Sequence, residues 1–185
     1  MTGGAGFIGS HLVDRLLAKG FEVWVLDDFS TGQMQNIKHH EDISTFHLVR
    51  GDVRDVDLVK KVVADVDVIF HEAALVDVRL SVENPLLFDD VNVVGTLNLL
   101  EACLKSDVKR FVFASSAAVY GNSETARKRE DMLPQPISPY GVSKLAAEYY
   151  VKVFSELYDL ETVSLRYFNV YGPRQGLTSG YSGVI

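Results

Sequence analysis

The sequence predicts an α/β protein built on a doubly wound parallel β-sheet. Short apolar runs typical of buried strands alternate along the whole chain with amphipathic segments of helical period. Such alternation is the pattern of a parallel sheet that helices cover on both faces. A glycine-rich turn opens the chain, and acidic or hydroxyl residues follow the ends of several predicted strands. The carboxyl ends of the strands are where sheets of this kind bind their ligands.

The composition is that of an ordinary globular domain. The chain has 185 residues, of which 47% are hydrophobic and 23% are charged, enough for one sizeable core. The net charge is -7 and the basic residues are scattered, so we expect no nucleic-acid partner. No apolar run reaches the length of a membrane span, and the N-terminus lacks the pattern of a signal peptide. We therefore expect a cytoplasmic protein with no membrane partner. Cys103 stands alone, which excludes an internal disulfide and favours a small core residue.

The glycine turn predicts a phosphate-binding site. Gly3, Gly6 and Gly9 are spaced three apart, and an amphipathic helix follows them until Gly20. The free N–H groups and the positive dipole end at the start of such a helix can bind a pyrophosphate. Glycine is required in the turn because a side chain would block either the turn itself or the approach of the phosphates.

An acidic residue stands at the expected distance behind this turn. Residues 22–26 are predicted to form a buried strand that ends at Asp27 and Asp28. Asp27 follows Gly9 by 18 positions, close to the spacing of roughly 20 residues at which a carboxylate binds an adenosine ribose in a Rossmann-type fold. A carboxylate there repels a 2′-phosphate, which favours NAD over NADP. The alternative is a solvated acid at a strand end.

The strand that normally precedes the glycine turn is expected to be missing. Only Met1 and Thr2 come before Gly3, and two residues are too few for the central strand of a parallel sheet. Either the chain is cut, its start is placed too late, or the sheet contains a gap. We therefore predict that residues 1–185 form an incomplete NAD-binding domain of the Rossmann type.

The remaining elements follow in alternation. Further strands are predicted at 45–49, 66–70, 110–114 and 162–167, and helices at 55–63, 84–106 and 140–158, with an irregular loop at 124–131. Asp55 is expected to cap the first of these helices, and Asn84 with Pro85 to begin the second. His71 has no second His or Cys at the spacing of metal ligands, so we predict a core or loop histidine and no metal site. On the last helix, the side chains predicted to face inward are Leu145, Tyr149, Val153, Phe154 and Leu157.

That last helix carries the candidate catalytic pair. Tyr140 and Lys144 are four residues apart, which places both side chains on one helical face. A neighbouring ammonium lowers the pKa of a phenol from its usual value near 10, so that the phenol can exchange a proton with a sugar hydroxyl. Ser115 and Ser116 end the preceding strand, where they could meet a ligand. Taken alone, the Tyr–Lys pair would fit an incidental pair on a helix surface.

Together these features resemble the extended short-chain dehydrogenase/reductases. Within that family the chain is most similar to the nucleotide-sugar 4-epimerases, and the resemblance covers essentially the whole chain. The segments that carry it are TGGAGFIGSH, LDDFSTG, SSAAVYG, SPYGVSK and RYFNVYGPRQ. The resemblance implies epimerisation of a nucleotide sugar at C4, of the UDP-glucose/UDP-galactose type, through a 4-keto intermediate and with NAD as cofactor.

The resemblance also assigns roles to individual residues. It implies that the catalytic residues are Ser116, Tyr140 and Lys144, and that Ser116, Tyr140 and Asn169 contact the substrate. It implies contacts with NAD for Gly3, Gly6, Phe7, Ile8, Gly9, Asp27, Asp28, Ser30, Thr31, Gly32, Asp52, Val53, Ala73, Ala74, Asn92, Ser115, Tyr140, Lys144, Tyr167 and Phe168.

Four further expectations rest on the same resemblance. The C-terminal substrate domain of the family would begin where this chain ends, so we expect it to be largely absent. A homodimer is expected through the Asn84 and Tyr140 helices, with Tyr149, Tyr150 and Phe154 in the interface. Where many members have a serine near the sugar diphosphate, this chain has Asp77, which would repel phosphate unless Arg79 screens it. Related dehydratases carry an Asp-Glu pair where this chain has Ala117 and Ala118, which favours an epimerase.

Three alternatives to the epimerase remain open. They are a dehydratase of the same family, a decarboxylase of the same family, and a fragment that binds NAD without catalysis.

Overall fold

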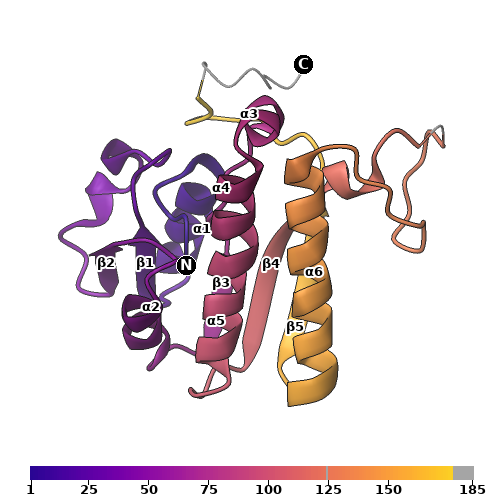
Figure 1. Ribbon diagram of the computed structural model, residues 1–185. Helices are drawn as coiled ribbons and strands as arrows, with labels where there is room; N and C mark the ends of the chain where they lie inside the picture. Colours follow the sequence, from indigo (N-terminus) through magenta and orange to yellow (C-terminus); the bar gives the residue numbers. More distant parts are fainter. Residues whose placement is uncertain (124, 177–185) are drawn as a thin grey trace.

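The computed structural model describes residues 1–123 and 125–176, and within them five strands run parallel to one another (Figure 1). The predicted strands are confirmed with small changes at their ends. Glu124, the first residue of the predicted loop, and residues 177–185 of the predicted domain lie outside the described residues. The strands are β1 (Val23–Asp27), β2 (Phe46–Arg50), β3 (Val68–His71), β4 (Arg110–Ser116) and β5 (Glu161–Tyr167).

Met1 and Thr2 hold the place of the expected missing strand. Thr2 forms parallel bridges to both Leu26 and His71, so it connects β1 to β3. Its N–H donates to the carbonyl of Phe70 at 3.0 Å, and Leu26 N–H donates to the carbonyl of Met1 at 2.9 Å. The order across the sheet is therefore β2-β1-Thr2-β3-β4-β5, the order of the doubly wound fold with its first strand reduced to one bridging residue. The expectation that the sheet contains a gap at this place is therefore wrong.

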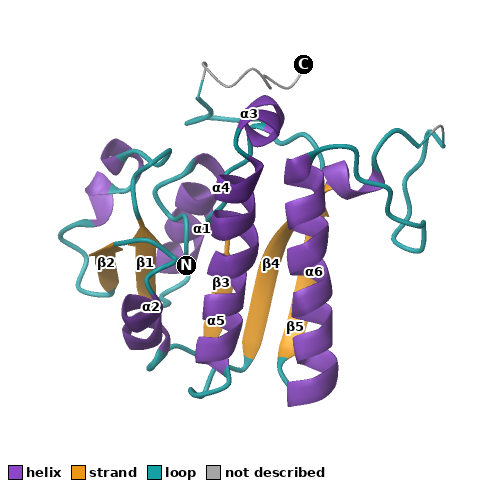
Figure 2. Cartoon of the chain, in the orientation of Figure 1, coloured by secondary structure: helices purple, strands orange, loops and turns teal. Residues whose placement is uncertain are grey.

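Two separate cores show that helices cover both faces of the sheet. On one face, α1 (Phe7–Ala18) packs through Val13 against Val23 and Val25 of β1. On the other face, Leu26 of β1 joins a larger core with residues of α2 (Val56–Val63), α5 (Gly95–Cys103) and α6 (Pro139–Tyr158). Because alternate residues of a strand point to opposite faces, β1 contributes to both cores. In Figure 2, α5 and α6 lie side by side in front of the strands.

The helix predicted from residue 84 to about 106 is present but irregular. It consists of α4 (Pro85–Asp89), a π-helical turn η3 (Asp90–Val94) and α5. A short helix α3 (Val78–Glu83) precedes it, with Asp77 as its cap. Asp55 caps α2 as predicted, accepting from Leu58 N–H at 3.1 Å. Short 3₁₀ turns η1 (Met34–Asn36), η2 (Lys38–His40) and η4 (Ala117–Tyr120) complete the described elements.

The inward face predicted for α6 is partly wrong. Phe154 is buried, but Tyr149, Val153 and Leu157 are 51%, 43% and 68% exposed. The buried face of the helix instead carries Tyr140, Ser143, Lys144, Ala147, Val151 and Phe154. Apolar side chains occur all round this helix, so their periodicity could not decide which row faces the sheet. No helix among the described residues has the length and apolar character that a membrane span needs.

Candidate active site

Two adjoining cavities lie at the carboxyl ends of the strands. The first has a volume of about 310 Å³ and is bounded by the glycine turn and the ends of β1, β2 and β3. The second has a volume of about 400 Å³ and is bounded by the start of α1, the ends of β4 and β5, and α6. Glu72 and Ala74 line both cavities, so they mark the place where one passes into the other. This is the sheet edge at which the sequence predicted a ligand site.

Most of the predicted site residues line one of these cavities. Those in the first are Gly3, Gly6, Asp27, Asp28, Ser30, Thr31, Asp52, Val53, Ala73 and Ala74. Those in the second are Phe7, Ile8, Ala74, Ser115, Ser116, Tyr140, Lys144, Tyr167, Phe168 and Asn169. The predicted residues that line neither cavity are Gly9, Gly32 and Asn92.

The glycine turn has no room for side chains. Gly3 has φ of +67°, and a Cβ on it would lie 2.6 Å from the backbone nitrogen of Ala73. A Cβ on Gly9 would lie 2.1 Å from the carbonyl oxygen of Gly3. The helix that follows has Gly6 as its N-cap, and no side chain caps its first turn. Its first N–H groups and its positive dipole end can therefore receive an anion at the first cavity.

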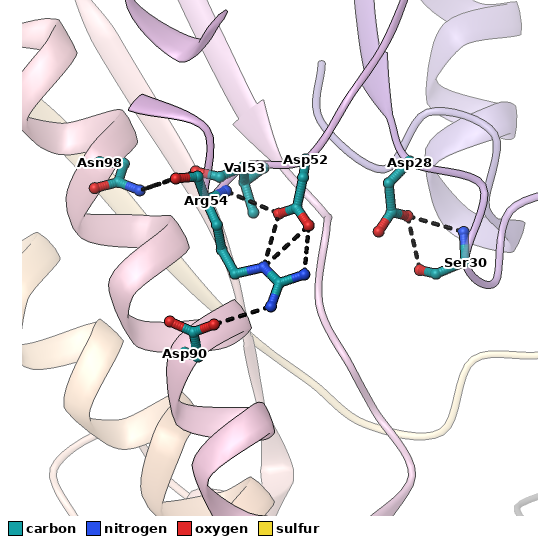
Figure 3. Close-up of polar contacts among 7 residues, drawn as sticks. All are labelled: Asp28, Ser30, Asp52, Val53, Arg54, Asp90 and Asn98. Atoms are coloured by element: carbon teal, nitrogen blue, oxygen red, sulfur yellow. Dashed lines mark hydrogen bonds and ion pairs between the residues drawn. The ribbon is translucent and has the colours of Figure 1, made fainter. Parts of the chain in front are cut away.

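Asp27 connects the glycine turn to the end of β1. Its side chain is buried and accepts hydrogen bonds from Ala5 N–H at 2.8 Å and from Phe29 N–H at 2.9 Å. Burial raises the pKa of this carboxyl group, and the two backbone donors act against that rise. Each carboxylate oxygen has a second lone pair, so Asp27 can still accept a bond from a ribose hydroxyl. Its neighbour Asp28 accepts from the N–H and the hydroxyl of Ser30 at 2.9 and 2.7 Å (Figure 3).

Arg54 is a residue of the first cavity that the sequence reasoning missed. Its guanidinium donates to Asp52 from Nη2 at 2.6 Å and from Nε at 3.0 Å, and its other Nη reaches Asp90 at 2.9 Å (Figure 3). These bonds lower the pKa of Asp52. Asn98 holds the same loop by donating to the carbonyl oxygens of Val53 and Arg54 at 3.1 and 3.3 Å. Arg54 therefore fixes the carboxylate of Asp52, one of the residues expected to contact NAD.

Asn92 supports the first cavity from behind. It lies in the π-helical turn and is only 1% exposed. Its amide accepts from Leu75 N–H at 2.9 Å and donates to the Leu75 carbonyl at 3.0 Å and to Ser143 Oγ at 3.0 Å. We expect its contribution to ligand binding to be indirect, because these bonds hold the loop that lines the first cavity.

The second cavity brings the candidate catalytic residues together. Ser138 caps α6 by accepting from Gly141 N–H at 3.1 Å, and the first turns of the helix place Tyr140 and Lys144 in the cavity wall. Both side chains are buried. Lys144 Nζ lies 4.9 Å from the centroid of the Phe113 ring. Burial lowers the pKa of Lys144 to about 8, and the nearby carboxylate of Glu72 acts against that shift.

The two serines at the end of β4 differ in their partners. Ser116 lines the second cavity and accepts from Ala118 N–H at 3.1 Å, which caps η4. Ser115 also lines that cavity, but its hydroxyl donates to Glu148 of α6 at 2.6 Å. Glu148 is in turn paired with Arg166 of β5 at 2.6 Å, in a largely buried ion pair. The Ser115 hydroxyl is therefore bonded to α6, whereas the Ser116 hydroxyl caps η4 in the cavity that Tyr140 and Lys144 also line.

Glu72, which lines both cavities, is another site residue that the sequence did not predict. It follows β3 directly and accepts a hydrogen bond from the Tyr167 hydroxyl at 3.0 Å. Burial raises the pKa of Glu72, while Tyr167 and Lys144 act against the rise. The preceding residue, His71, is fully paired as a core histidine, with Thr2 Oγ1 at 2.7 Å and Thr96 Oγ1 at 2.9 Å.

Asp77 and a cluster of Asp14, His39 and His40 lie outside the cavities, and contacts within the protein account for both. Asp77 accepts from Leu80 N–H at 2.9 Å as the cap of α3, and Arg79, the residue considered for screening its charge, lies near Glu83 instead. Asp14, His39 and His40 form a group that could hold a metal ion among the described residues. The Asp14 carboxylate already accepts from both imidazoles and from Arg174, and that guanidinium, 2.8 Å away, disfavours a cation.

Comparison with known proteins identifies the family. The family model described as GDP-mannose 4,6 dehydratase matches residues 1–182. The chain belongs to this family. It is the epimerase and dehydratase branch of the short-chain dehydrogenase/reductases that the sequence motifs indicated.

The proteins to which the chain is similar include both epimerases and dehydratases. The UDP-glucose 4-epimerase of Mycolicibacterium smegmatis is 43% identical over all of this chain and 59% of its own length. The Thermus thermophilus UDP-glucose 4-epimerase, solved with NAD, is 46% identical with a TM-score of 0.87, over 95% of this chain and 56% of that one. A Streptomyces venezuelae dTDP-glucose 4,6-dehydratase, also solved with NAD, is 35% identical with a TM-score of 0.90, over 94% of this chain and 56% of that one. The chain thus spans less than two thirds of these family members.

Proposed function

We propose that this protein is an NAD-dependent nucleotide-sugar epimerase that inverts C4 through a 4-keto intermediate, on substrates of the UDP-glucose/UDP-galactose type. The observation that carries the proposal is that Tyr140, Lys144 and Ser116 all line the second cavity, which adjoins the glycine-lined first cavity. In this proposal the described residues form the NAD-binding domain of the enzyme.

The first cavity fits the adenosine and pyrophosphate parts of NAD. The uncapped start of α1 offers N–H groups to the pyrophosphate, and the contacts of Gly3 leave no room for a side chain there. Asp27 and Asp28 stand where ribose hydroxyls would bind, and their carboxylates oppose the extra phosphate of NADP. Asp52 offers an acceptor to the adenine amino group. The bound cofactor supplies the acceptance and return of hydride.

The residues of the second cavity then handle the proton. Tyr140 takes the proton of the sugar 4-hydroxyl, and later returns it to the other epimer. Lys144, buried in the same cavity, would favour the phenolate form of Tyr140 through the charge of its ammonium group. Ser116 donates a hydrogen bond to the reacting oxygen. Tyr167 ends β5, Phe168 and Asn169 follow it, and all three line the same cavity and border the sugar.

A dehydratase is the second candidate, and it is favoured by the similarity to the Streptomyces enzyme. Elimination across the sugar needs an additional acid and base, and η4 has Ala117 and Ala118 at the positions facing the second cavity. Among the described residues that line this cavity, Glu72 is the one carboxylate, and it is hydrogen-bonded to Tyr167. The alanines at these two positions leave the described part of the cavity without the additional acid and base, which favours the epimerase.

A homodimer through α4 and α6 is part of the proposal. Exposed apolar side chains on these two helices include Leu86, Leu87, Tyr149, Tyr150, Val153 and Leu157. Such a row on neighbouring helices suits a four-helix interface, although Phe154, expected in that interface, is buried in the core.

Turnover of nucleotide sugars by the complete protein tests the proposal. We expect UDP-glucose and UDP-galactose to interconvert, and the Tyr140→Phe variant to lose the activity while still binding NAD. Tyr158→Phe, an exposed tyrosine at the end of the same helix, is the matched control and should retain activity. Formation of a 4-keto-6-deoxy sugar instead of the epimer would support the dehydratase. Full activity of Tyr140→Phe would contradict both.

A further inference from the structure

Glu72 occupies the passage between the two cavities. It follows the last residue of β3, and its N–H bonds to the Thr2 carbonyl at 3.3 Å, which fixes its backbone beside the centre of the sheet. Only Glu72 and Ala74 line both cavities among the described residues. A dinucleotide with its pyrophosphate at α1 and its reactive ring beside Tyr140 must therefore pass Glu72. This step rests on the function proposed above.

The chemistry of that ring changes during the reaction. The nicotinamide of NAD⁺ carries a positive charge, whereas the nicotinamide of NADH is neutral. A carboxylate close to the ring therefore attracts one form and not the other, and the attraction is strong because the site is partly withdrawn from water. Lys144 is the cation among the described residues lining the second cavity, and its charge opposes that of the oxidised ring.

The Glu72 carboxylate is held in place for such a role. The Tyr167 hydroxyl donates to one of its oxygens at 3.0 Å, and Tyr167 is the last residue of β5 and lines the second cavity. Burial raises the pKa of this carboxyl group, and Tyr167 and Lys144, which both favour the ionised form, reduce that rise.

We propose that Glu72 sets the balance between oxidised and reduced cofactor, by pairing its carboxylate with the positively charged nicotinamide of NAD⁺. The residue thereby offsets the charge of Lys144, which would otherwise weaken the binding of NAD⁺ relative to that of NADH. Retention of the oxidised form keeps the enzyme ready to accept hydride from the next substrate molecule.

The ratio of two dissociation constants tests this inference without catalysis. NAD⁺ and NADH are titrated separately into the purified chain and into Glu72→Gln, by calorimetry at one pH. Glutamine keeps the size of the side chain and can still accept the bond from Tyr167. We expect the preference for NAD⁺ over NADH to fall roughly tenfold, the effect of losing one moderately screened charge pair.

Asp28→Asn is the matched control, because Asp28 is a carboxylate at the other end of the cofactor site, bonded to Ser30. Asp28→Asn should raise the dissociation constants of NAD⁺ and NADH by the same factor. Glu72→Met provides a second variant that removes the charge, and it should lower the preference as Glu72→Gln does. An unchanged preference in the Glu72 variants, or an equal change in Asp28→Asn, overturns the inference. Failure of the unmodified chain to bind either form would instead contradict the proposed function, and the inference with it.

Discussion

Asn92 and Ser143 join the two halves of the site through a hydrogen bond of 3.0 Å from the asparagine amide to the serine hydroxyl. Asn92 belongs to the π-helical turn behind the first cavity, and Ser143 precedes Lys144 on α6. The same amide also pairs with the N–H and the carbonyl of Leu75. The wall of the first cavity and the helix that carries Tyr140 are therefore fixed to each other by one buried side chain.

Replacement of Asn92 should destabilise the fold. Asn92→Leu keeps the branched shape of the side chain but leaves the backbone groups of Leu75 without partners, and we expect the free energy of unfolding to fall by about 3 kcal/mol. Urea denaturation measures this loss. Asn98→Leu is the control, since Asn98 is more exposed and its bonds to Val53 and Arg54 are longer. Equal losses in the two variants would contradict the role given to Asn92.

The buried pair of Glu148 and Arg166 should be worth more than an exposed pair of similar geometry. The side chains of Glu148 and Arg166 are 13% and 15% exposed. We expect Glu148→Gln to lower the free energy of unfolding by about 3 kcal/mol, because it leaves the guanidinium without its counter-charge. Glu161→Gln, which breaks the exposed pair with Arg110, should cost less than about 1 kcal/mol. Urea titrations of both variants decide the point, and a smaller loss in Glu148→Gln would refute it.

His71 should make stability depend on pH in the acid range. Burial lowers its pKa from 6.5 to about 3, so between these values the unfolded chain binds a proton that the folded chain does not. The contribution of His71 to the free energy of unfolding therefore falls by about 1.4 kcal/mol for each unit that the pH drops below 6.5. Above pH 6.5 this contribution does not change with pH. His71→Gln removes the contribution, so its stability curve should converge toward the unmodified curve on acidification. Parallel curves in that range would show that His71 does not titrate as described.

Arg54 should strengthen cofactor binding through Asp52. In Arg54→Gln the Asp52 carboxylate loses the guanidinium that orients it, and we expect the dissociation constant of NAD to rise roughly tenfold. Arg129→Gln removes an arginine that bonds the aspartate two residues away, Asp131, outside both cavities. Calorimetric titration should find normal affinity in this control. Unchanged affinity in Arg54→Gln would place Arg54 outside the binding machinery.

The sequence predicted the strands, the glycine turn and the two ends of the site, because each has a local pattern. Gly3, Gly6 and Gly9 have a fixed spacing, Asp27 follows a short apolar run, and Tyr140 and Lys144 stand one helical turn apart. These patterns do not depend on which elements become neighbours. In the structure Gly3, Gly6, Asp27, Tyr140 and Lys144 line the two cavities at the carboxyl ends of the strands.

The parts that the sequence could not predict depend on contacts between distant segments. Thr2 completes the sheet through a parallel bridge to Leu26 and a hydrogen bond to the Phe70 carbonyl, which no local pattern reveals. Glu72 gains its position from Tyr167, 95 residues further along the chain. The buried face of α6 is chosen by the sheet beneath it, since apolar residues such as Val153 and Val151 occur on both sides of the helix.

Unfolding of this chain with and without NAD tests the central claim most directly, namely that the glycine turn, Asp27 and Asp52 form a working cofactor site. With NAD at about a hundred times its dissociation constant, the free energy of unfolding should rise by about 2.7 kcal/mol, which corresponds to an increase of roughly 5–10 °C in Tm. NADP at the same concentration should give a smaller increase. A cooperative transition at the same temperature with and without NAD would contradict the account.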